Sequence, residues 1–392
     1  MLSPTRKLDA HPYTRFSDLI PRRHRGLPLP AESERFHYTY NARAAIYQFL
    51  CSLPRSERDT VLVPAFHCPT VVTPALRAGF KVEFYRVRRD LTLDTDDATA
   101  KISDRIAAVV AINYFGFPAN LDPMLAAARH AGIPLIEDCS HSFLRTNPLG
   151  FTGLRGDASV YSFWKIVPSM VGGGLRINNP EFEQRFDSGP LPLGNSVKRC
   201  KLMLEEAING TDNAIVKAGF NFLERQRVRL KTRGRASAAP AAATLSIDDV
   251  FPFDPTLACA RIPAVSRMVM EGSDLAAVAE ARRRNYEAMS ASLADSPRLQ
   301  MLRAVLPPEV CPWAVPVILR DRRNLDYRLR AQGVPLYTHG DTLHPLVFAG
   351  PPSPMLDDAR FLADNLLCLA IHQHLSEEDV RSYSATIGQI LQ

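Results

Sequence analysis

The chain alternates short apolar runs with segments of helical spacing, and this alternation limits its possible folds more than any other feature. Strand-like apolar runs occur at 60–66, 105–116 and 133–141, and helix-like segments at 69–80 and 121–132 separate them. Near-continuous runs of Val, Ile and Ala between helices are typical of parallel strands in a sheet covered on both faces. We therefore predict an α/β fold with a mostly parallel mixed sheet flanked by helices.

Size and composition are those of a soluble globular protein. At 392 residues the chain is too long for one simple core, so we expect two domains. We find no apolar run of eighteen residues and no apolar segment beside the N-terminal charges, so we expect a cytoplasmic protein without a transmembrane segment. The seven cysteines are odd in number and never spaced as C-x-x-C. Reduced thiols and no metal site are the natural interpretation.

Changes of character along the chain divide it into four parts. Residues 1–35 are rich in Pro, Arg and His without periodicity and predict an N-terminal arm. Residues 36–183 hold the alternation and predict the large domain. Residues 184–258 predict a helical insertion followed by an Ala/Pro-rich linker. In residues 259–392 strands and helices no longer alternate regularly, which predicts a smaller C-terminal α+β domain.

Candidate chemical groups follow the predicted strands, and the carboxyl ends of such strands form the functional edge of an α/β sheet. A buried lone carboxylate is costly, so Asp138 needs a partner; a protonated pyridine nitrogen and neighbouring loop amides both qualify. Lys165 follows the next strand with Ser162, and a lysine whose pKa is lowered by burial can form a Schiff base with an aldehyde cofactor. By itself, however, a lysine after an aromatic residue is more often a surface residue. The helix that Asn41 is suited to cap offers free amides to a phosphate or to water.

In this order the segments resemble the large domain of fold-type-I pyridoxal-phosphate enzymes, and more narrowly the DegT/StrS family of nucleotide-sugar aminotransferases. The resemblance runs from about Tyr40 to Val171 and resumes from about Arg261. The segments that carry it are VLVPAFHCPTVVTPALRAGFKVEFYRV, AINYFGFPANLDPMLAAARHAGIPLIEDCSHSF, GLRGDASVYSFWKIVPSMVGGGLRINN, ARRRNYEAM and LAIHQHLSEEDV. It implies pyridoxal 5'-phosphate as the cofactor and a smaller C-terminal domain beside the large one.

The resemblance also implies roles for single residues. Lys165 would carry the cofactor and shuttle the proton during transfer. The implied cofactor-binding residues are Asp138 at the ring nitrogen, His141 at the ring hydroxyl, Arg43 and Ala44 through their backbone amides and Ser162 through its hydroxyl at the phosphate, and Tyr114 with Gly116 near the ring.

The chain departs from the family pattern at three places. Cys68 stands where an aromatic residue usually stacks on the cofactor ring, and His67 and Phe66 are the candidates to replace it. The segment before Lys165 is two residues shorter than usual. No counterpart of the asparagine that a partner subunit lends to the phosphate precedes Arg261.

Three functions remain open at this point. The first is transfer of an amino group from an amino-acid donor, glutamate by resemblance, to a keto group of a nucleotide-linked sugar. Such a reaction would serve polysaccharide, glycolipid or antibiotic-sugar synthesis. For this function we expect a homodimer that binds no nucleic acid. The second is a pyridoxal-phosphate-dependent sugar dehydratase, although such relatives replace the lysine with histidine. The third is a catalytically degenerate scaffold or regulatory protein. The excess of basic over acidic residues, 47 − 41 = 6, suits an anionic substrate, and the basic segment 196–235 adds the hypothesis of contact with a membrane surface.

Histidine and tryptophan side chains outside these motifs are weaker candidates. His339, His344, His372 and His374 lack metal spacing, and we expect at least two of them to be loop or capping residues; His344 is the one that we expect could approach substrate. Trp164 is predicted to pack or to form a wall of the pocket beside the lysine.

Overall fold

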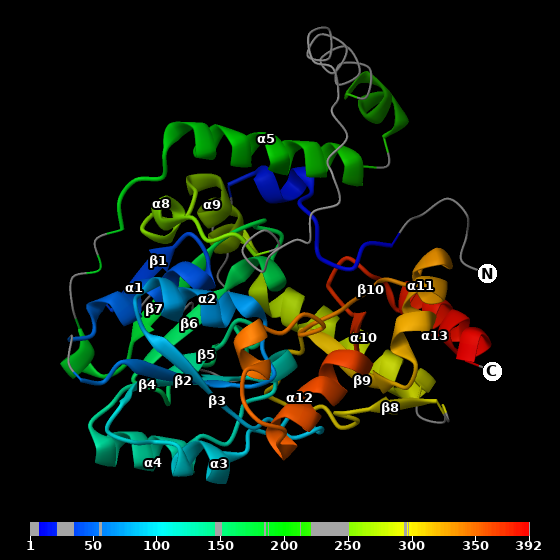
Figure 1. The fold of residues 1–392 in the computed structure, drawn as a ribbon. Helices are drawn as coiled ribbons and strands as arrows, with labels where there is room; N and C mark the ends of the chain where they lie inside the picture. The colour runs from blue at the N-terminus through cyan, green and yellow to red at the C-terminus, as the bar shows by residue number, and fades with distance from the viewer. Residues whose placement is uncertain are drawn as a thin grey trace, which may run out of the picture.

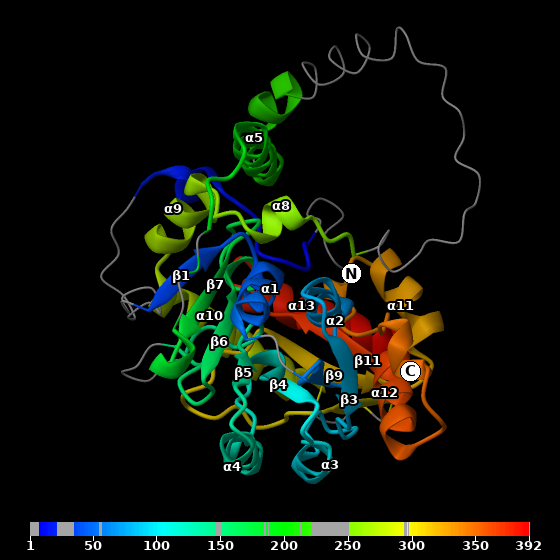
Figure 2. The ribbon, with the colours of Figure 1, turned by 60° about the vertical axis from the view of Figure 1, so that its left-hand side comes forward.

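The computed structural model describes residues 8–21, 35–54, 57–145, 151–183, 186, 188–211, 213–220, 251–293, 296 and 298–391. Figures 1 and 2 show a large sheet with helices on both faces and a second, smaller α+β unit beside it. No helix in these ranges combines the length and apolar character that a membrane span requires.

Seven strands build the large sheet, in the order β1-β7-β6-β5-β4-β2-β3. Their bounds are β1 Phe36–Thr39, β2 Thr60–Pro64, β3 Lys81–Tyr85, β4 Ile106–Ile112, β5 Leu135–Asp138, β6 Ala158–Ser162 and β7 Gly173–Ile177. Neighbouring strands from β3 to β6 are parallel, whereas β7 is antiparallel to both β6 and β1. The predicted mostly parallel mixed sheet is therefore confirmed.

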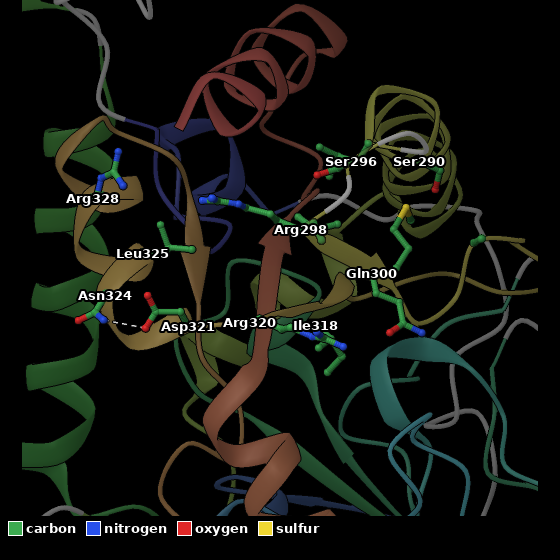
Figure 3. Close-up of a pocket in the computed structure, with 14 residues that line it drawn as sticks. Ser290, Ser296, Arg298, Gln300, Ile318, Arg320, Asp321, Asn324, Leu325 and Arg328 are labelled. Carbon is green, nitrogen blue, oxygen red and sulfur yellow. Dashed lines mark hydrogen bonds between the residues drawn. The ribbon is translucent and has the colours of Figure 1, made fainter. Parts of the chain in front are cut away.

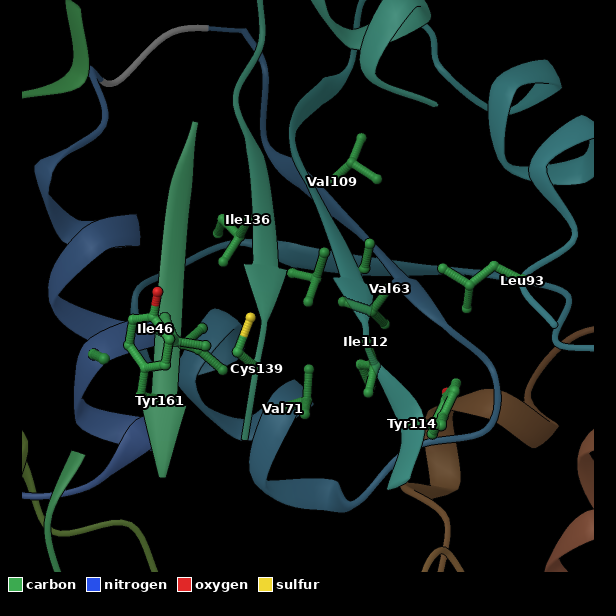
Figure 4. Packing of buried hydrophobic residues seen from close by; sticks show 14 of the residues in the cluster. Ile46, Val63, Val71, Leu93, Val109, Ile112, Tyr114, Ile136, Cys139 and Tyr161 are labelled. Atoms are coloured by element: carbon green, nitrogen blue, oxygen red, sulfur yellow. The ribbon is translucent and has the colours of Figure 1, made fainter. Parts of the chain in front are cut away.

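The central strands are apolar throughout because helices cover both faces of the sheet. Every residue of β2, β4, β5 and β6 is buried. Figures 1 and 2 place α1 (Ala42–Ser52) and α2 (Pro69–Arg77) on one face, and α3 (Thr95–Ala100) and α4 (Asp122–Ala131) on the other. Figure 4 shows Ile46 of α1 and Val71 of α2 packing against residues of the strands. Burial of this apolar surface is the main stabilising contribution to the large domain.

The smaller unit has a four-stranded antiparallel sheet with a core of its own. Its strands lie in the order β10-β11-β9-β8. Their bounds are β8 Leu299–Met301, β9 Ala314–Leu319, β10 Leu336–Tyr337 and β11 Leu366–Ala370, and the helices are α10 Leu275–Leu293, α11 Arg322–Ala331, α12 Pro354–Asn365 and α13 Glu377–Leu391. Ser376 caps the start of α13, since the Asp379 amide donates to the Ser376 hydroxyl and the Ser376 amide to the Asp379 carboxylate.

The segment between the two units is helical where it is described. It contains α5 (Leu193–Gly210), a helical stretch at 214–220, α8 (Pro255–Ala258) and α9 (Ala264–Gly272). In Figures 1 and 2, α5 lies on the outside of the molecule, near α9. The short 3-10 helices are η1 Phe16–Leu19, η3 Tyr114–Gly116, η4 Phe163–Lys165, η5 Pro180–Phe182 and η6 Pro345–Phe348. The end of the predicted basic segment, residues 221–235, and the Ala/Pro-rich linker lie outside the described residues.

Candidate active site

Lys165 lies in η4, directly after β6, and faces a cavity between the two units. The cavity has a volume of about 360 Å³. Its lining residues are His11, Asn41, Ala42, Arg43, Cys68, Thr70, Ser140, Ser162, Trp164, Lys165, Phe251, Trp313, Tyr337, Thr338 and His339. The Lys165 ammonium lies 4.7 Å from the centre of the Trp313 ring. Burial lowers the pKa of Lys165, and the nearby Asp138 carboxylate opposes this shift.

Asp138 ends β5, the strand next to β6, so its carboxylate lies on the same edge of the sheet as the lysine. The carboxylate is buried, and one of its oxygens accepts a hydrogen bond of 2.8 Å from the Ser140 amide. Burial raises the pKa of Asp138, while Ser140 and Lys165 pull that pKa down. The structure thus brings the two predicted key residues together at the ends of adjacent strands.

The start of α1 forms another side of the cavity. The Asn41 side chain caps this helix, as predicted, by accepting a hydrogen bond of 2.9 Å from the Ala44 amide. That amide therefore already has a partner, although the sequence predicts it as a phosphate ligand. Arg43 lines the cavity and donates to the Pro252 carbonyl, and its buried Nε has no hydrogen-bond partner among the described residues. Ser162, at the end of β6, lines the same region.

Three of the other predicted residues lie behind the cavity surface. His141 is buried with its ring centre 4.0 Å from that of Trp313. Tyr114 is buried too, and its hydroxyl donates to the Phe66 carbonyl. His67 is fully buried, stacks on Phe84, and accepts a hydrogen bond of 3.3 Å from the His344 amide at Nε2.

At the position of the expected ring-stacking residue, Cys68 lines the cavity, and neither Phe66 nor His67 does. The aromatic residues that do line it are the two tryptophans Trp164 and Trp313, with Phe251 and Tyr337. Trp164 therefore forms part of the wall, in agreement with the sequence prediction.

Sequence reasoning did not assign the residues of the N-terminal arm and the small unit that line the cavity. His11 comes from the arm, and Tyr337, Thr338 and His339 come from β10 and the turn after it. Among the C-terminal histidines, the sequence analysis named His344 as the one that could approach substrate. In the structure His344 caps η6 by accepting from the Leu346 amide, and it is His339 that lines the cavity. Only the spatial meeting of distant segments reveals these residues, because none belongs to a motif with the lysine.

Arg282 of α10 holds the backbone that carries the lysine. Its fully buried guanidinium donates to the carbonyls of Lys165 and Ile166, each at 3.1 Å, and to the Trp313 carbonyl at 3.0 Å. A buried cation without hydrogen bonds would be costly, so these carbonyls stabilise it. One side chain therefore ties the lysine turn of the large domain to the small unit.

A larger hollow on the small unit does not carry comparable chemistry (Figure 3). It has a volume of about 1080 Å³ and contains the exposed side chains of Arg298, Arg320 and Arg328. Its Asp321 already accepts a hydrogen bond of 2.7 Å from Asn324. We therefore assign the candidate active site to the smaller cavity, which Lys165 lines and where the buried Asp138 carboxylate on the adjacent strand interacts electrostatically with the lysine.

The seven-stranded mixed sheet and the smaller antiparallel sheet together define the fold class, which solved structures of similar proteins share. It is the fold type I of pyridoxal-phosphate-dependent transferases. Residues 38–188 match the model of the DegT/DnrJ/EryC1/StrS aminotransferase family, which confirms the predicted family resemblance over this segment.

Among curated proteins, the chain is similar to UDP-4-amino-4,6-dideoxy-N-acetyl-beta-L-altrosamine transaminase of Campylobacter jejuni. The two are 25% identical over 187 residues, which make up 46% of this chain and 46% of the relative. The match thus spans about half the length of that relative.

Solved structures with the same fold cover most of the chain. AtS13 from Actinomadura melliaura is 18% identical, with a TM-score of 0.65, and the match covers 99% of this chain and 100% of that one. The aminotransferase TlmJ from Streptoalloteichus hindustanus is 20% identical, with a TM-score of 0.64 and coverage of 91% and 86%. At these identities the likeness establishes the fold, and the predicted fold class is confirmed.

Proposed function

We propose that this protein is a pyridoxal-phosphate-dependent aminotransferase that moves an amino group from glutamate to a keto group of a nucleotide-linked sugar. The observation that carries the proposal is that Lys165 lines the cavity while Asp138, at the end of the adjacent strand, interacts electrostatically with it. The curated relative supports a sugar acceptor, because it is named as a transaminase of a UDP-linked amino sugar.

The residues around the cavity fit this cofactor. The cavity's volume of about 360 Å³ falls within the range of small-molecule sites, roughly 300–1,000 Å³. A buried carboxylate suits a cationic ring nitrogen, and the unpartnered Nε of Arg43 with the Ser162 hydroxyl suits a phosphate. When bound, the cofactor supplies an electron sink for negative charge at the carbon of the amino donor.

Three side chains of this chain would then have distinct roles. Asp138 would accept a hydrogen bond from the ring nitrogen and keep a proton there. Lys165 has a pKa lowered by burial, so a larger share of its amine is neutral and able to take a proton from the donor carbon. Arg282 would keep the lysine in place through the carbonyls that it binds.

Covalent attachment of the cofactor at Lys165 tests the proposal. The purified protein is mixed with pyridoxal phosphate, treated with borohydride, digested and analysed by peptide mass spectrometry. We expect the label on the peptide that contains Lys165, and no label and no turnover in Lys165→Ala. The control is Lys198→Ala, an exposed lysine on α5, which should be labelled as the wild type is. Labelling that persists in Lys165→Ala would contradict the assignment.

A scaffold or regulatory role is the second candidate, and two observations favour it. Cys68 lies where the family has a stacking aromatic residue, and the Ala44 amide is already bonded to Asn41. Both would weaken cofactor binding. A protein that shows no absorbance change with millimolar pyridoxal phosphate would support this role.

We further propose a homodimer by family resemblance, which light scattering at several protein concentrations would test.

A further inference from the structure

A second wall of the cavity comes from the N-terminal arm and the small unit. His11, Tyr337 and His339 all line it. Each has a buried polar atom without a hydrogen-bond partner in the part of the chain that the structure describes: Nδ1 of His11, the hydroxyl of Tyr337 and Nε2 of His339. Buried polar atoms are nearly always bonded in folded proteins, so three such atoms beside one cavity indicate groups that a ligand satisfies.

The arm is held on both sides of His11. Before it, the Asp9 carbonyl lies 2.9 Å from Nε2 of His372. After it, the buried Thr14 hydroxyl bonds to the Pro168 carbonyl at 3.0 Å and to the Glu206 carboxylate at 2.6 Å. These contacts hold the backbone of the arm before and after His11, so the His11 side chain projects from a fixed segment.

The ring of His11 is oriented by packing between the two units. Its centre lies 4.7 Å from that of Tyr337 in the small unit and 5.4 Å from that of Trp164 beside the lysine. The ring therefore keeps its direction while Nδ1 remains available to a ligand.

The chemistry of this wall suits neutral hydroxyl groups. Burial, with Lys165 and Arg282 nearby, lowers the pKa of His11 to about 4, and burial lowers the pKa of His339 well below its usual value. Both imidazoles are therefore neutral at pH 7 and offer one donor and one acceptor each, as the Tyr337 hydroxyl does. A carboxylate or a phosphate would instead need a cationic fork.

We infer that His11 binds a ring hydroxyl of the acceptor sugar, with Tyr337 and His339 beside it, and that this contact selects which sugar is accepted. The inference rests on the proposed function, which supplies a hydroxylated acceptor. His11 acts on the substrate and takes no part in holding the cofactor.

The test compares binding of a nucleotide with and without its sugar. Protein loaded with pyridoxal phosphate is reduced with borohydride, so that chemistry is blocked, and is titrated calorimetrically with UDP and with UDP-4-amino-4,6-dideoxy-N-acetyl-β-L-altrosamine. In His11→Phe we expect the affinity for the sugar nucleotide to fall roughly 5- to 100-fold, because a polar contact is lost, with UDP affinity unchanged. His11→Gln, which keeps a donor and an acceptor, should recover part of the loss.

His37→Gln is the matched control. Nε2 of His37 is also buried without a partner among the described residues, but its ring packs on Phe186 and does not line the cavity. This variant should bind both probes as the wild type does. If His11→Phe does not fold, as judged by its melting temperature, Tyr337→Phe removes the neighbouring hydroxyl and provides the same comparison.

Three outcomes would overturn the inference. The first is an equal loss of affinity for both probes in His11→Phe, and the second is a loss of cofactor uptake in that variant before reduction. The third is a wild type that binds the sugar nucleotide no better than UDP. If such a protein still takes up pyridoxal phosphate and reacts with glutamate, the proposed transaminase activity stands while the role of His11 falls. If the wild type takes up no cofactor, both the proposed transaminase activity and the proposed role of His11 are rejected.

Discussion

At the scale of single residues, the site is built from charges that burial makes unfavourable. Burial raises the pKa of Asp138 and lowers the pKa of Lys165, and each group opposes the shift of the other. Desolvation is the largest cause in both cases, so the pair does not compensate its own burial. Such uncompensated groups are common where a ligand completes the site.

Replacing the carboxylate tests the site at this scale. Asp138→Asn keeps the shape but loses the charge that would face a ring cation, so we expect the affinity for pyridoxal phosphate to fall roughly 10- to 100-fold in an absorbance titration. The control is Glu137→Gln on the same strand, whose carboxylate accepts from Asn113 at 2.8 Å. That variant should lower stability and leave cofactor affinity intact. Equal losses in both variants would speak against a specific role for Asp138.

Stability should depend on pH through His67. Burial lowers the pKa of this side chain to about 4, against 6.5 in an unfolded chain. Between these values the unfolded chain binds a proton that the native state does not, so the stabilisation is present above pH 6.5 and lost as pH falls toward 4. The loss amounts to at most roughly 3 kcal/mol.

Urea unfolding at pH 7 and pH 5 measures this effect. His67→Gln should show a smaller difference in unfolding free energy between the two pH values than the wild type. The exposed His130→Gln on α4 should keep the wild-type difference. His11 contributes in the same direction, because its pKa is also about 4, so the difference should shrink without vanishing. An unchanged difference in His67→Gln would contradict the burial argument.

At the scale of elements, the start of α1 serves both the helix and the cavity. Asn41 caps the helix through the Ala44 amide and also lines the cavity. The same amide cannot fully serve the cap and a phosphate at once. If the proposed cofactor binds here, competition between them would link the stability of this helix to cofactor binding.

Removing the cap should expose this competition. Asn41→Ala should lower the unfolding free energy of the cofactor-free protein by about 1 kcal/mol, because an N-cap is lost. Ser353→Ala removes the N-cap of α12, where Ser353 accepts from the Leu356 amide at 3.3 Å, and should cost a similar amount. Added pyridoxal phosphate should restore more stability to Asn41→Ala, since its phosphate can use the freed amide. Denaturant unfolding with and without cofactor checks this, and equal restoration in both variants would reject it.

At the scale of the whole molecule, the two units meet directly behind the site. The Trp313 amide donates to the Phe115 carbonyl at 3.0 Å, and Arg282 joins the lysine turn to the small unit. Gly116 allows this close approach. Its φ is +102°, and a Cβ there would collide with the Cys311 carbonyl and lie 2.9 Å from Cα of Pro312.

Two glycine substitutions separate backbone strain from this contact. Gly132→Ala strains the left-handed end of α4, but its Cβ would meet nothing within 4 Å, so we expect a loss of about 1 kcal/mol. Gly116→Ala adds a collision with backbone atoms, and we expect a loss of at least roughly 3 kcal/mol together with weaker cofactor binding. Thermal unfolding measures both, and similar losses would show that the contact between the units is not rigid.

The main strands and helices, and the class of fold that they form, can be predicted from local patterns in the sequence. Continuous apolar runs such as β4 predict buried parallel strands, and Gly132 and Ser376 mark helix ends, because these signals depend only on neighbouring residues. The sequence also placed Asp138 and Lys165 after adjacent strands. Three findings come from the three-dimensional structure: His11 and His339 line the same cavity, His67 packs behind it, and Arg282 binds the backbone of the lysine turn. These contacts join residues far apart in the chain, and their positions follow from packing between whole units, which no local pattern encodes.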